Sequence, residues 1–193
     1  REDLWVAIDR ANFNPPSKAA RKAGWVDGFI HFDVDVSQRP LPISVQGVLS
    51  LVHQDGGAIG GFQGVPWLFE HFDTWVKTQG PGRDPHRPDM GPLQDKIVKP
   101  ELFPGDLLIF NSLLAHGVAP NTSEGQVRMA QYISMAPADE QVLVEREARI
   151  RSWRDLTPPA RAGFPGDPRN WEKTHAKTAQ LTPLGEKLLG LKS

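Results

Sequence analysis

Two histidines, one carboxylate and one arginine stand in an order that could build a metal centre: His31, Asp33, His116 and Arg128. Residues two apart on a β-strand point to the same face, about 7 Å apart at roughly 3.3 Å per residue. His31 and Asp33 can therefore reach one metal ion, and a histidine from a distant strand can complete the set. Two imidazoles and one carboxylate leave three coordination positions open, which suits a non-haem Fe(II) that binds a cosubstrate and O₂.

Arg128 follows His116 by twelve residues, about where the next antiparallel strand would return a cation toward the metal. A guanidinium there can pair with the far carboxylate of a keto-diacid. Taken singly, His116 is typical of a satisfied core histidine and Arg128 of one half of an ion pair. In this order, together with His31 and Asp33, they favour a functional site.

The His-x-Asp pattern occurs three times, so the residues around each copy must decide between them. The copy at His71 and Asp73 lies among apolar residues at helical spacing, which predicts a helix over Trp67–Lys77. Residues two apart on a helix diverge by about 200° and cannot share a metal ion. This copy is therefore set aside.

The copy at His53 and Asp55 is the closer rival. It ends an apolar run, Val48–Val52, and is followed directly by Gly56 and Gly57. That sequence is typical of a strand that ends in a tight turn, with the Asp55 side chain bound to its own backbone. We therefore expect a turn rather than a metal site at this copy.

The remaining copy, at His31, lies in a segment that reads as a strand, Trp25–Val36, so the metal ligands are assigned to it. Runs rich in β-branched and aromatic residues, bounded by turn residues, predict a β-rich core with helices at its edges. The predicted strands are Leu4–Ile8, Trp25–Val36, Ser44–Val52, Ala58–Gln63, Leu107–Phe110, Leu113–Val118 and Gln126–Met135, and Asn12–Pro16 are expected to form a loop. Besides the helix over Trp67–Lys77, the predicted helices are Asp139–Trp153 and Leu184–Leu189, the last capped by Thr182 and Pro183.

Side chains alternate along a strand, so Arg128 shares a face with Ala130, Tyr132 and Ser134. We expect that face to line the interior of a barrel.

Composition narrows the class of protein. A net charge of −1 and a pI near 6.7 argue against binding to nucleic acid or to an anionic membrane. The apolar runs are too short to span a bilayer, and the first residues do not resemble a signal peptide. The chain has no cysteine, so any metal must be held by histidine and carboxylate, and a cytoplasmic location is expected.

Four stretches of the sequence resemble the phytanoyl-CoA dioxygenase family of Fe(II)/2-oxoglutarate oxygenases, in its bacterial branch. They read IHFDVDVS, VQGVLSLVHQDGGAIGGFQGVP, FPGDLLIFNSLLAHGVAPNTSEGQVRMAQYISM and RNWEKTHAKTAQLTPLGEKLLGL. The likeness covers most of the chain, and the motifs occur in the family's order. It implies a mainly β fold, a double-stranded β-helix (jelly-roll or cupin-like) core with flanking α-helices.

By that resemblance, His31, Asp33 and His116 are the catalytic metal ligands and Arg128 binds 2-oxoglutarate. Gln46 falls near a position from which the family often directs another side chain toward the cosubstrate. The implied cofactors are Fe(II), 2-oxoglutarate and O₂. The implied reaction hydroxylates an unactivated C–H of a small-molecule substrate and releases succinate and CO₂. A carboxylate at position 33 favours hydroxylation, since halogenating relatives usually carry a small residue there.

Family members usually have a longer region ahead of the first ligand, so the resemblance implies that the usual N-terminal helical part is lacking here. We expect one domain over residues 1–193, with an insertion or lid at 63–103 and a C-terminal helical segment at 139–193. Long loops often bind ligands, and Arg83, His86 or Arg87 of the insertion could meet an acidic substrate group. The alternative is a solvated loop whose charges pair locally.

Two other functions stay open. A cupin-like metal enzyme that does not use 2-oxoglutarate would keep the three ligands and would have no use for Arg128 as an anchor. A non-catalytic β-sandwich binding module would keep the fold and bind neither Fe(II) nor 2-oxoglutarate, since one fold supports unrelated functions. The sequence does not indicate the oligomeric state.

Overall fold

The computed structural model describes residues 3–9, 11–16, 28–41, 44–80, 82–138, 142–159 and 168–192. The chain divides into two compact units, one of Arg1–Asp9 with Ile133–Ser193 and one of Arg10–Tyr132. The division falls within a single long strand. The single domain expected over residues 1–193 stays a prediction.

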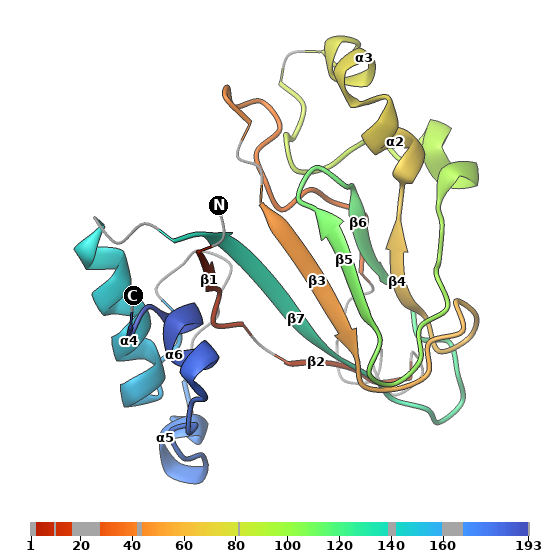
Figure 1. Cartoon of the computed structure of the whole chain (residues 1–193). Coiled ribbons are helices and arrows are strands. Elements are labelled where there is room, and N and C mark those ends of the chain that lie inside the picture. The colour runs from red at the N-terminus through yellow and green to blue at the C-terminus, as the bar shows by residue number, and fades with distance from the viewer. Residues whose placement is uncertain are drawn as a thin grey trace. The chain divides into compact units, whose positions relative to one another are not determined.

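The larger sheet contains four strands in the Arg10–Tyr132 unit (Figure 1). Strand β3 (Val45–Ser50) pairs antiparallel with β5 (Leu107–Asn111) and lies next to β7 (Arg128–Pro137). Strand β2 (Ala11–Asn14) pairs antiparallel with the first residues of β7. A turn precedes strand β5. In this turn Gly105 has a left-handed φ of 96°, and the Phe103 amide donates to the Asp106 side chain.

A second, two-stranded sheet joins β4 (Gly61–Gly64) antiparallel to β6 (His116–Ala119). Single bridges extend it on both sides, because His116 also pairs with His31 and Gly64 also pairs with Val98. Four chain segments are therefore hydrogen-bonded side by side at the level of His116.

The side chains between the strands form two apolar clusters. One joins residues of both sheets: Val48, Phe62, Leu102 and Ala130, with Leu108, Phe110, Leu114 and Tyr132 packed against them. The other gathers around the segment that holds His31 and Asp33, and its buried members are Ile30, Phe32, Val36, Val65, Leu68, Phe72, Leu93, Leu113 and Ala115. Phe32, between the two candidate ligands, is 1% exposed, so this segment is fixed by burial of its middle residue.

The helix predicted over Trp67–Lys77 is interrupted in the structure. Helix α2 (Pro66–Glu70) ends and α3 (Phe72–Lys77) begins at His71, whose backbone lies outside the helical region. A short 3₁₀ helix, η1 (Gly91–Lys96), follows. The predicted helical spacing of apolar residues still describes both helices, because Leu68 of α2 and Phe72 of α3 are buried in one cluster.

In the other unit, β1 (Leu4–Val6) pairs antiparallel with the end of β7. After β7, the chain forms helices α4 (Leu143–Asp155), α5 (Trp171–His175) and α6 (Pro183–Leu189). The Thr182 side chain accepts a hydrogen bond from the Gly185 amide, as expected for a cap. Arg146 and Arg149 of α4 donate to backbone carbonyls at the end of α6, so these two cations cap a helix.

A β-rich, antiparallel fold with helices is confirmed, and three local expectations are wrong. The segment around His31 is not a regular strand: His31 alone forms a bridge, and a turn follows in which the Ser37 amide donates to Asp35. Residues 25–27 of that predicted strand lie outside the described residues. Asn12 to Asn14, expected in a loop, belong to β2, because pairing with β7 outweighs their turn preference. The strand that carries His116 begins at that residue rather than at Leu113, because the Leu113 and Leu114 amides both donate to Asn111 in a turn.

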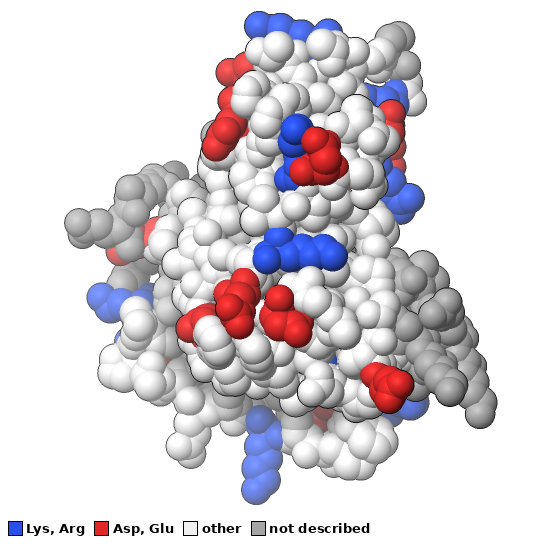
Figure 2. Space-filling view, turned by 90° about the vertical axis from the view of Figure 1, so that its right-hand side faces the viewer, with Lys and Arg blue, Asp and Glu red and all other residues white. Residues whose placement is uncertain are grey.

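No helix in the described part of the chain has the length and apolarity to cross a bilayer. On the face shown in Figure 2, basic and acidic side chains are interspersed, without a broad area of either sign. On this face, no broad charged area of the described residues would attract a ligand of one sign.

Candidate metal centre

The backbone bridge between His31 and His116 brings two distant histidines together. The His31 amide donates to the His116 carbonyl at 2.8 Å, and the His116 amide donates back at 2.9 Å. Residues paired in this way on neighbouring strands project their side chains to the same face. The two imidazole centroids lie 5.0 Å apart.

Gly117 makes this pairing possible. A Cβ atom at this position would lie 2.3 Å from the Phe29 carbonyl oxygen, which is backbone and cannot move aside alone. Glycine is therefore required for the segment before His31 to approach β6 this closely.

Asp33 completes the group. His31 Nε2 lies 3.2 Å from Asp33 Oδ1, and His116 Nε2 lies 3.7 Å from Asp33 Oδ2. One potential ligand atom from each of His31, Asp33 and His116 can be chosen so that all lie within 4.8 Å of one another. The two-apart spacing places His31 and Asp33 together even without a regular strand.

The other ring nitrogen of each histidine is held by backbone. His31 Nδ1 lies 3.1 Å from the Phe29 carbonyl oxygen, and His116 Nδ1 lies 2.8 Å from the Leu114 carbonyl oxygen. A carbonyl can only accept, so each Nδ1 carries the proton and each Nε2 is the coordinating atom. Such contacts are typical of histidines that bind metal, because they fix the orientation of the ring.

Burial decreases across the group. The side chains of His116, His31 and Asp33 are 11%, 31% and 46% exposed, so the site is closed behind His116 and open to solvent beside Asp33. The hydrogen bond from His31 holds the pKa of Asp33 well below its usual range. Burial lowers the pKa of His116. Burial also acts against the charged form of His31, but its contacts with Asp33 and Phe29 raise its pKa overall.

The shifts at Asp33 and His116 favour an ionised carboxylate and a neutral imidazole, which are the forms that bind metal, whereas the raised pKa of His31 favours a protonated ring beside Asp33. An ion between His31 and Asp33 would replace the proton that they otherwise share.

Gln46 of β3 approaches Asp33 from the larger sheet. Its amide nitrogen donates a short hydrogen bond to Asp33 Oδ2. Its carbonyl oxygen is buried and accepts no hydrogen bond from the residues that the structure describes. Gln46 therefore orients the carboxylate and leaves one acceptor free at the site.

Arg128, the first residue of β7, is fully buried. Its Nε donates to Gln54 Oε1 at 2.8 Å and its Nη1 donates to Asn12 Oδ1 at 2.7 Å, while Nη2 has no hydrogen-bond partner in the described part of the chain. Both partners are neutral amides. Among the described residues, no carboxylate forms an ion pair with this buried cation.

Arg128 faces the same interior as the histidines. Ala130, two residues further along the same face of β7, packs in one cluster with Phe62 and Phe110. Those two rings also contact His116, at centroid distances of 5.9 Å and 4.6 Å. The predicted face of Arg128 and Ala130 is therefore an inner one.

The second His-x-Asp copy has the structure of a turn. The Gly57 amide donates to Asp55 Oδ1 at 2.8 Å, as expected from the sequence. His53 lies 2.8 Å from Glu101 and stacks on Phe103, away from any third metal-binding side chain of the described residues. In the third copy, His71 stacks on Trp67 and its Nδ1 contacts the Trp67 carbonyl.

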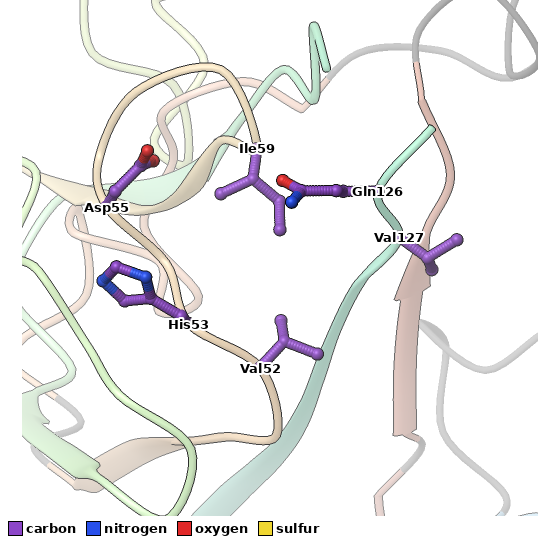
Figure 3. Close-up of a pocket in the computed structure, with 6 residues that line it drawn as sticks. All are labelled: Val52, His53, Asp55, Ile59, Gln126 and Val127. Carbon is purple, nitrogen blue, oxygen red and sulfur yellow. The ribbon is translucent and has the colours of Figure 1, made fainter. Parts of the chain in front are cut away.

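A pocket of about 370 Å³ lies beside the second copy (Figure 3). Figure 3 shows that its walls come from the loop after β3 and from the segment that leads into β7; its lining residues are Val52, His53, Asp55, Ile59, Gln126 and Val127. None of the three candidate ligands lines it. The pocket and the metal-binding group are therefore separate features.

Two residues of the site were missed by sequence reasoning. Asn12 stands in a segment that reads as a loop, and Gln54 is the middle residue of the second His-x-Asp copy. Both matter because they hold the Arg128 guanidinium. Neither carried a signal, since a single amide side chain is common in turns.

No family model and no curated protein sequence matches the chain. Its structure is similar to the crystal structure of EvdMO1, with a TM-score of 0.49 and 20% identity over 72% of this chain. It is also similar to HygX from Streptomyces hygroscopicus, solved with nickel and 2-oxoglutarate bound, with a TM-score of 0.33 and 14% identity over 68% of this chain. The aligned part spans 28% of EvdMO1 and 72% of HygX. Similarities this weak do not decide what the present chain binds, so its function is argued from its own geometry.

Proposed function

We propose that the protein is a non-haem Fe(II)- and 2-oxoglutarate-dependent dioxygenase that hydroxylates a small molecule. One observation carries the proposal: the His31, Asp33 and His116 group, which could hold a metal ion, shares an interior with Arg128, a buried cation with no negative partner among the described residues. The first feature fits a divalent metal. The second fits an acidic cosubstrate.

The three side chains would hold the metal through two Nε2 atoms and one carboxylate oxygen. That set leaves half of an octahedron open, as in non-haem iron oxygenases. Fe(II) bound there would supply, with 2-oxoglutarate and O₂, the oxidation of the substrate with release of succinate and CO₂. Asp33 would occupy one coordination position itself, which favours hydroxylation over halogenation.

Arg128 would bind the distal carboxylate of 2-oxoglutarate. A buried charge without a partner costs several kcal/mol, roughly, even after the protein relaxes. The neutral amides of Asn12 and Gln54 orient the guanidinium without cancelling its charge. Its unpartnered Nη2 leaves a donor for a carboxylate, which is the strongest acceptor for a guanidinium.

Gln46 would act on the metal through Asp33. By donating to Asp33 Oδ2, it keeps one carboxylate oxygen from rotating and directs the other toward His31. Contacts of this kind typically change metal affinity by about 10–100-fold. A contact between Gln46 and 2-oxoglutarate would need a bridging water, because the free amide oxygen and the keto-diacid dianion are both acceptors.

The two sheets of the Arg10–Tyr132 unit would be opposite walls of a double-stranded β-helix. In support, Val48 of β3, Phe62 of β4 and Ala130 of β7 belong to one apolar cluster. Inner residues of facing sheets pack in this way.

The test is an anaerobic titration of the protein with Fe(II) and 2-oxoglutarate, followed by the visible charge-transfer band of the chelated keto acid. Wild type is compared with His31→Ala, Arg128→Ala and the matched control His53→Ala. We expect the band in wild type and His53→Ala, its loss in His31→Ala, and a much higher 2-oxoglutarate requirement in Arg128→Ala.

Other outcomes identify other functions. Fe(II) binding with no band, and with Arg128→Ala indistinguishable from wild type, would indicate a metal enzyme that does not use 2-oxoglutarate. Absence of stoichiometric Fe(II) binding in wild type would indicate a non-catalytic module.

A further inference from the structure

We infer that Arg87, on the loop between α3 and η1, binds an acidic group of the substrate beside the metal centre. This inference rests on the proposed function, because it names the class of substrate for the same site. It predicts substrates with a carboxylate or a phosphate near the carbon that is hydroxylated.

The loop is hydrogen-bonded to the segment that carries His31 and Asp33. The Phe32 amide donates to the His86 carbonyl at 2.8 Å, and His86 Nδ1 lies 3.0 Å from the Phe32 carbonyl. Phe32 stands between His31 and Asp33 in the sequence. The position of residue 86 is therefore tied to the position of the ligands.

Arg87 reaches the ligand group on the side of His31, whose side chain is 31% exposed. Its guanidinium carbon lies 4.3 Å from the centre of the Phe29 ring, and that ring lies 5.2 Å from the His31 ring. The three side chains therefore form a row from the loop to the metal centre. A molecule that lies along this row can contact both the guanidinium and the metal site.

The guanidinium is available to a ligand. The Arg87 side chain is 62% exposed, and its one ion pair among the described residues is a loose one, 3.6 Å from Asp84. Such an exposed pair contributes little energy and is easily exchanged for a better partner. Phe29 is half exposed as well, so a cation and an aromatic side chain are both accessible to solvent beside His31.

The second arginine of the loop has a different environment. Arg83 stacks on Trp75 at 4.7 Å, and Trp75 packs against Phe32 on the side of the apolar cluster. Arg83 therefore carries the same charge on the same loop without facing Phe29. It provides a matched control for Arg87.

Arginine is suited to carboxylate and phosphate because its planar fork donates two parallel hydrogen bonds. A lysine at the same position would keep the charge and lose the fork. The variant Arg87→Lys therefore separates charge from geometry.

The experiment uses the full chain with Zn²⁺ and 2-oxoglutarate, and measures by NMR the binding of three probes: phenyl phosphate, benzoate and benzyl alcohol. We expect Arg87→Ala to weaken binding of the phosphate, the carboxylate or both by about tenfold or more, in line with a charge-assisted hydrogen bond. The affinity of Arg87→Lys for the anionic probes should lie between those of wild type and Arg87→Ala. The affinity of Arg83→Gln should equal that of wild type. Benzyl alcohol should bind equally to all four proteins.

A second measurement locates the anion. With Mn²⁺ in place of Zn²⁺, the probe's relaxation should be enhanced in wild type, because a ligand at Arg87 lies near the paramagnetic ion. The His31→Ala protein is the control for relaxation caused by free Mn²⁺, and it should give no enhancement of the probe's relaxation.

The outcomes separate this inference from the proposed function. Equal anion binding by wild type and Arg87→Ala, or no anion binding by either, would overturn the inference even if Fe(II) and 2-oxoglutarate bind. Binding that depends on Arg87 without paramagnetic enhancement in a metal-loaded protein would also overturn it. If no metal binds and the anion still requires Arg87, the anion site stands and the oxygenase proposal fails.

Discussion

The first and second His-x-Asp copies have the same pattern and opposite environments. His31 pairs with His116 through two backbone hydrogen bonds, and the ligand atoms of His31 and Asp33 face one point. His53 instead pairs with exposed Glu101, and Asp55 turns back to the Gly57 amide. A histidine and an aspartate two residues apart are therefore insufficient. The backbone pairing that brings a third ligand makes the difference.

The middle residues differ as much as the ligands. Phe32, in the first copy, is buried in an apolar cluster and fixes the segment. Gln54, in the second copy, is also fully buried, but it accepts a hydrogen bond from Arg128. The second copy therefore contributes to the proposed site through its middle residue, while its histidine and aspartate do not.

The largest expected effect contrasts Asp33→Ala with Asp55→Ala. Loss of Asp33 removes one of three ligands, so Fe(II) affinity should fall more than 100-fold, beyond the about 10–100-fold typical of contacts outside the ligand set. Asp55→Ala should bind Fe(II) as wild type does. Competition with a metal chelator measures both. Equal affinities would show that the assignment of the ligands is wrong.

Next in size is the contrast between Gly117→Ala and Gly57→Ala. A Cβ at Gly117 meets the Phe29 carbonyl at 2.3 Å, so the free energy of unfolding should fall by about 1–3 kcal/mol, as for other overpacked sites. A Cβ at Gly57 meets only the Asp55 side chain, at 3.2 Å, which can rotate. Urea denaturation of the two proteins checks this. A Gly117→Ala protein as stable as wild type would contradict the close approach at β6.

A smaller effect is expected for Gln54→Glu. The new carboxylate would neutralise Arg128 at its Nε, so affinity for 2-oxoglutarate should fall by about tenfold, the equivalent of about 1.4 kcal/mol. Metal affinity should not change, because Gln54 contacts none of the three ligands. Calorimetric titration with 2-oxoglutarate and with Zn²⁺ gives both values. Unchanged 2-oxoglutarate affinity would remove Arg128 as the anchor.

The smallest effect is expected for Glu101→Gln. The pair with His53 is exposed on both sides, and such pairs contribute about 0–1 kcal/mol. Neither Fe(II) affinity nor the free energy of unfolding should change by more than this amount. A large loss of metal binding in Glu101→Gln would give the second copy a role that its geometry does not support.

Much of the fold could be predicted because its strands have local signals. Leu107–Asn111 follows a Pro-Gly-Asp turn, and Val45–Ser50 overlaps the run Val48–Val52, in which Ser50 is the one polar residue. The segment around His31 was predicted as a strand for the same reason. It contains only one bridge, because burial of Phe32 and a turn at Asp35 determine its path.

The site was predictable only in part. His31, Asp33, His116 and Arg128 could be selected by residue type and order, and the structure places the first three together. The partners of Arg128 could not, because Asn12 and Gln54 are joined to it by pairings of strands far apart in the sequence. Gln46 could be selected only by resemblance; its amide nitrogen donates to Asp33, and its contact with the cosubstrate stays a prediction.

The backbone bridge between His31 and His116 also sets the order of events when the chain is made. The two residues are 85 positions apart (31 to 116), so His31 and Asp33 leave the ribosome well before their partner is synthesised. At about 5–20 residues per second, that interval lasts roughly 4–17 s. During this time the nascent chain offers an ion only two of its three ligands. Metal loading is therefore expected to follow synthesis of β6.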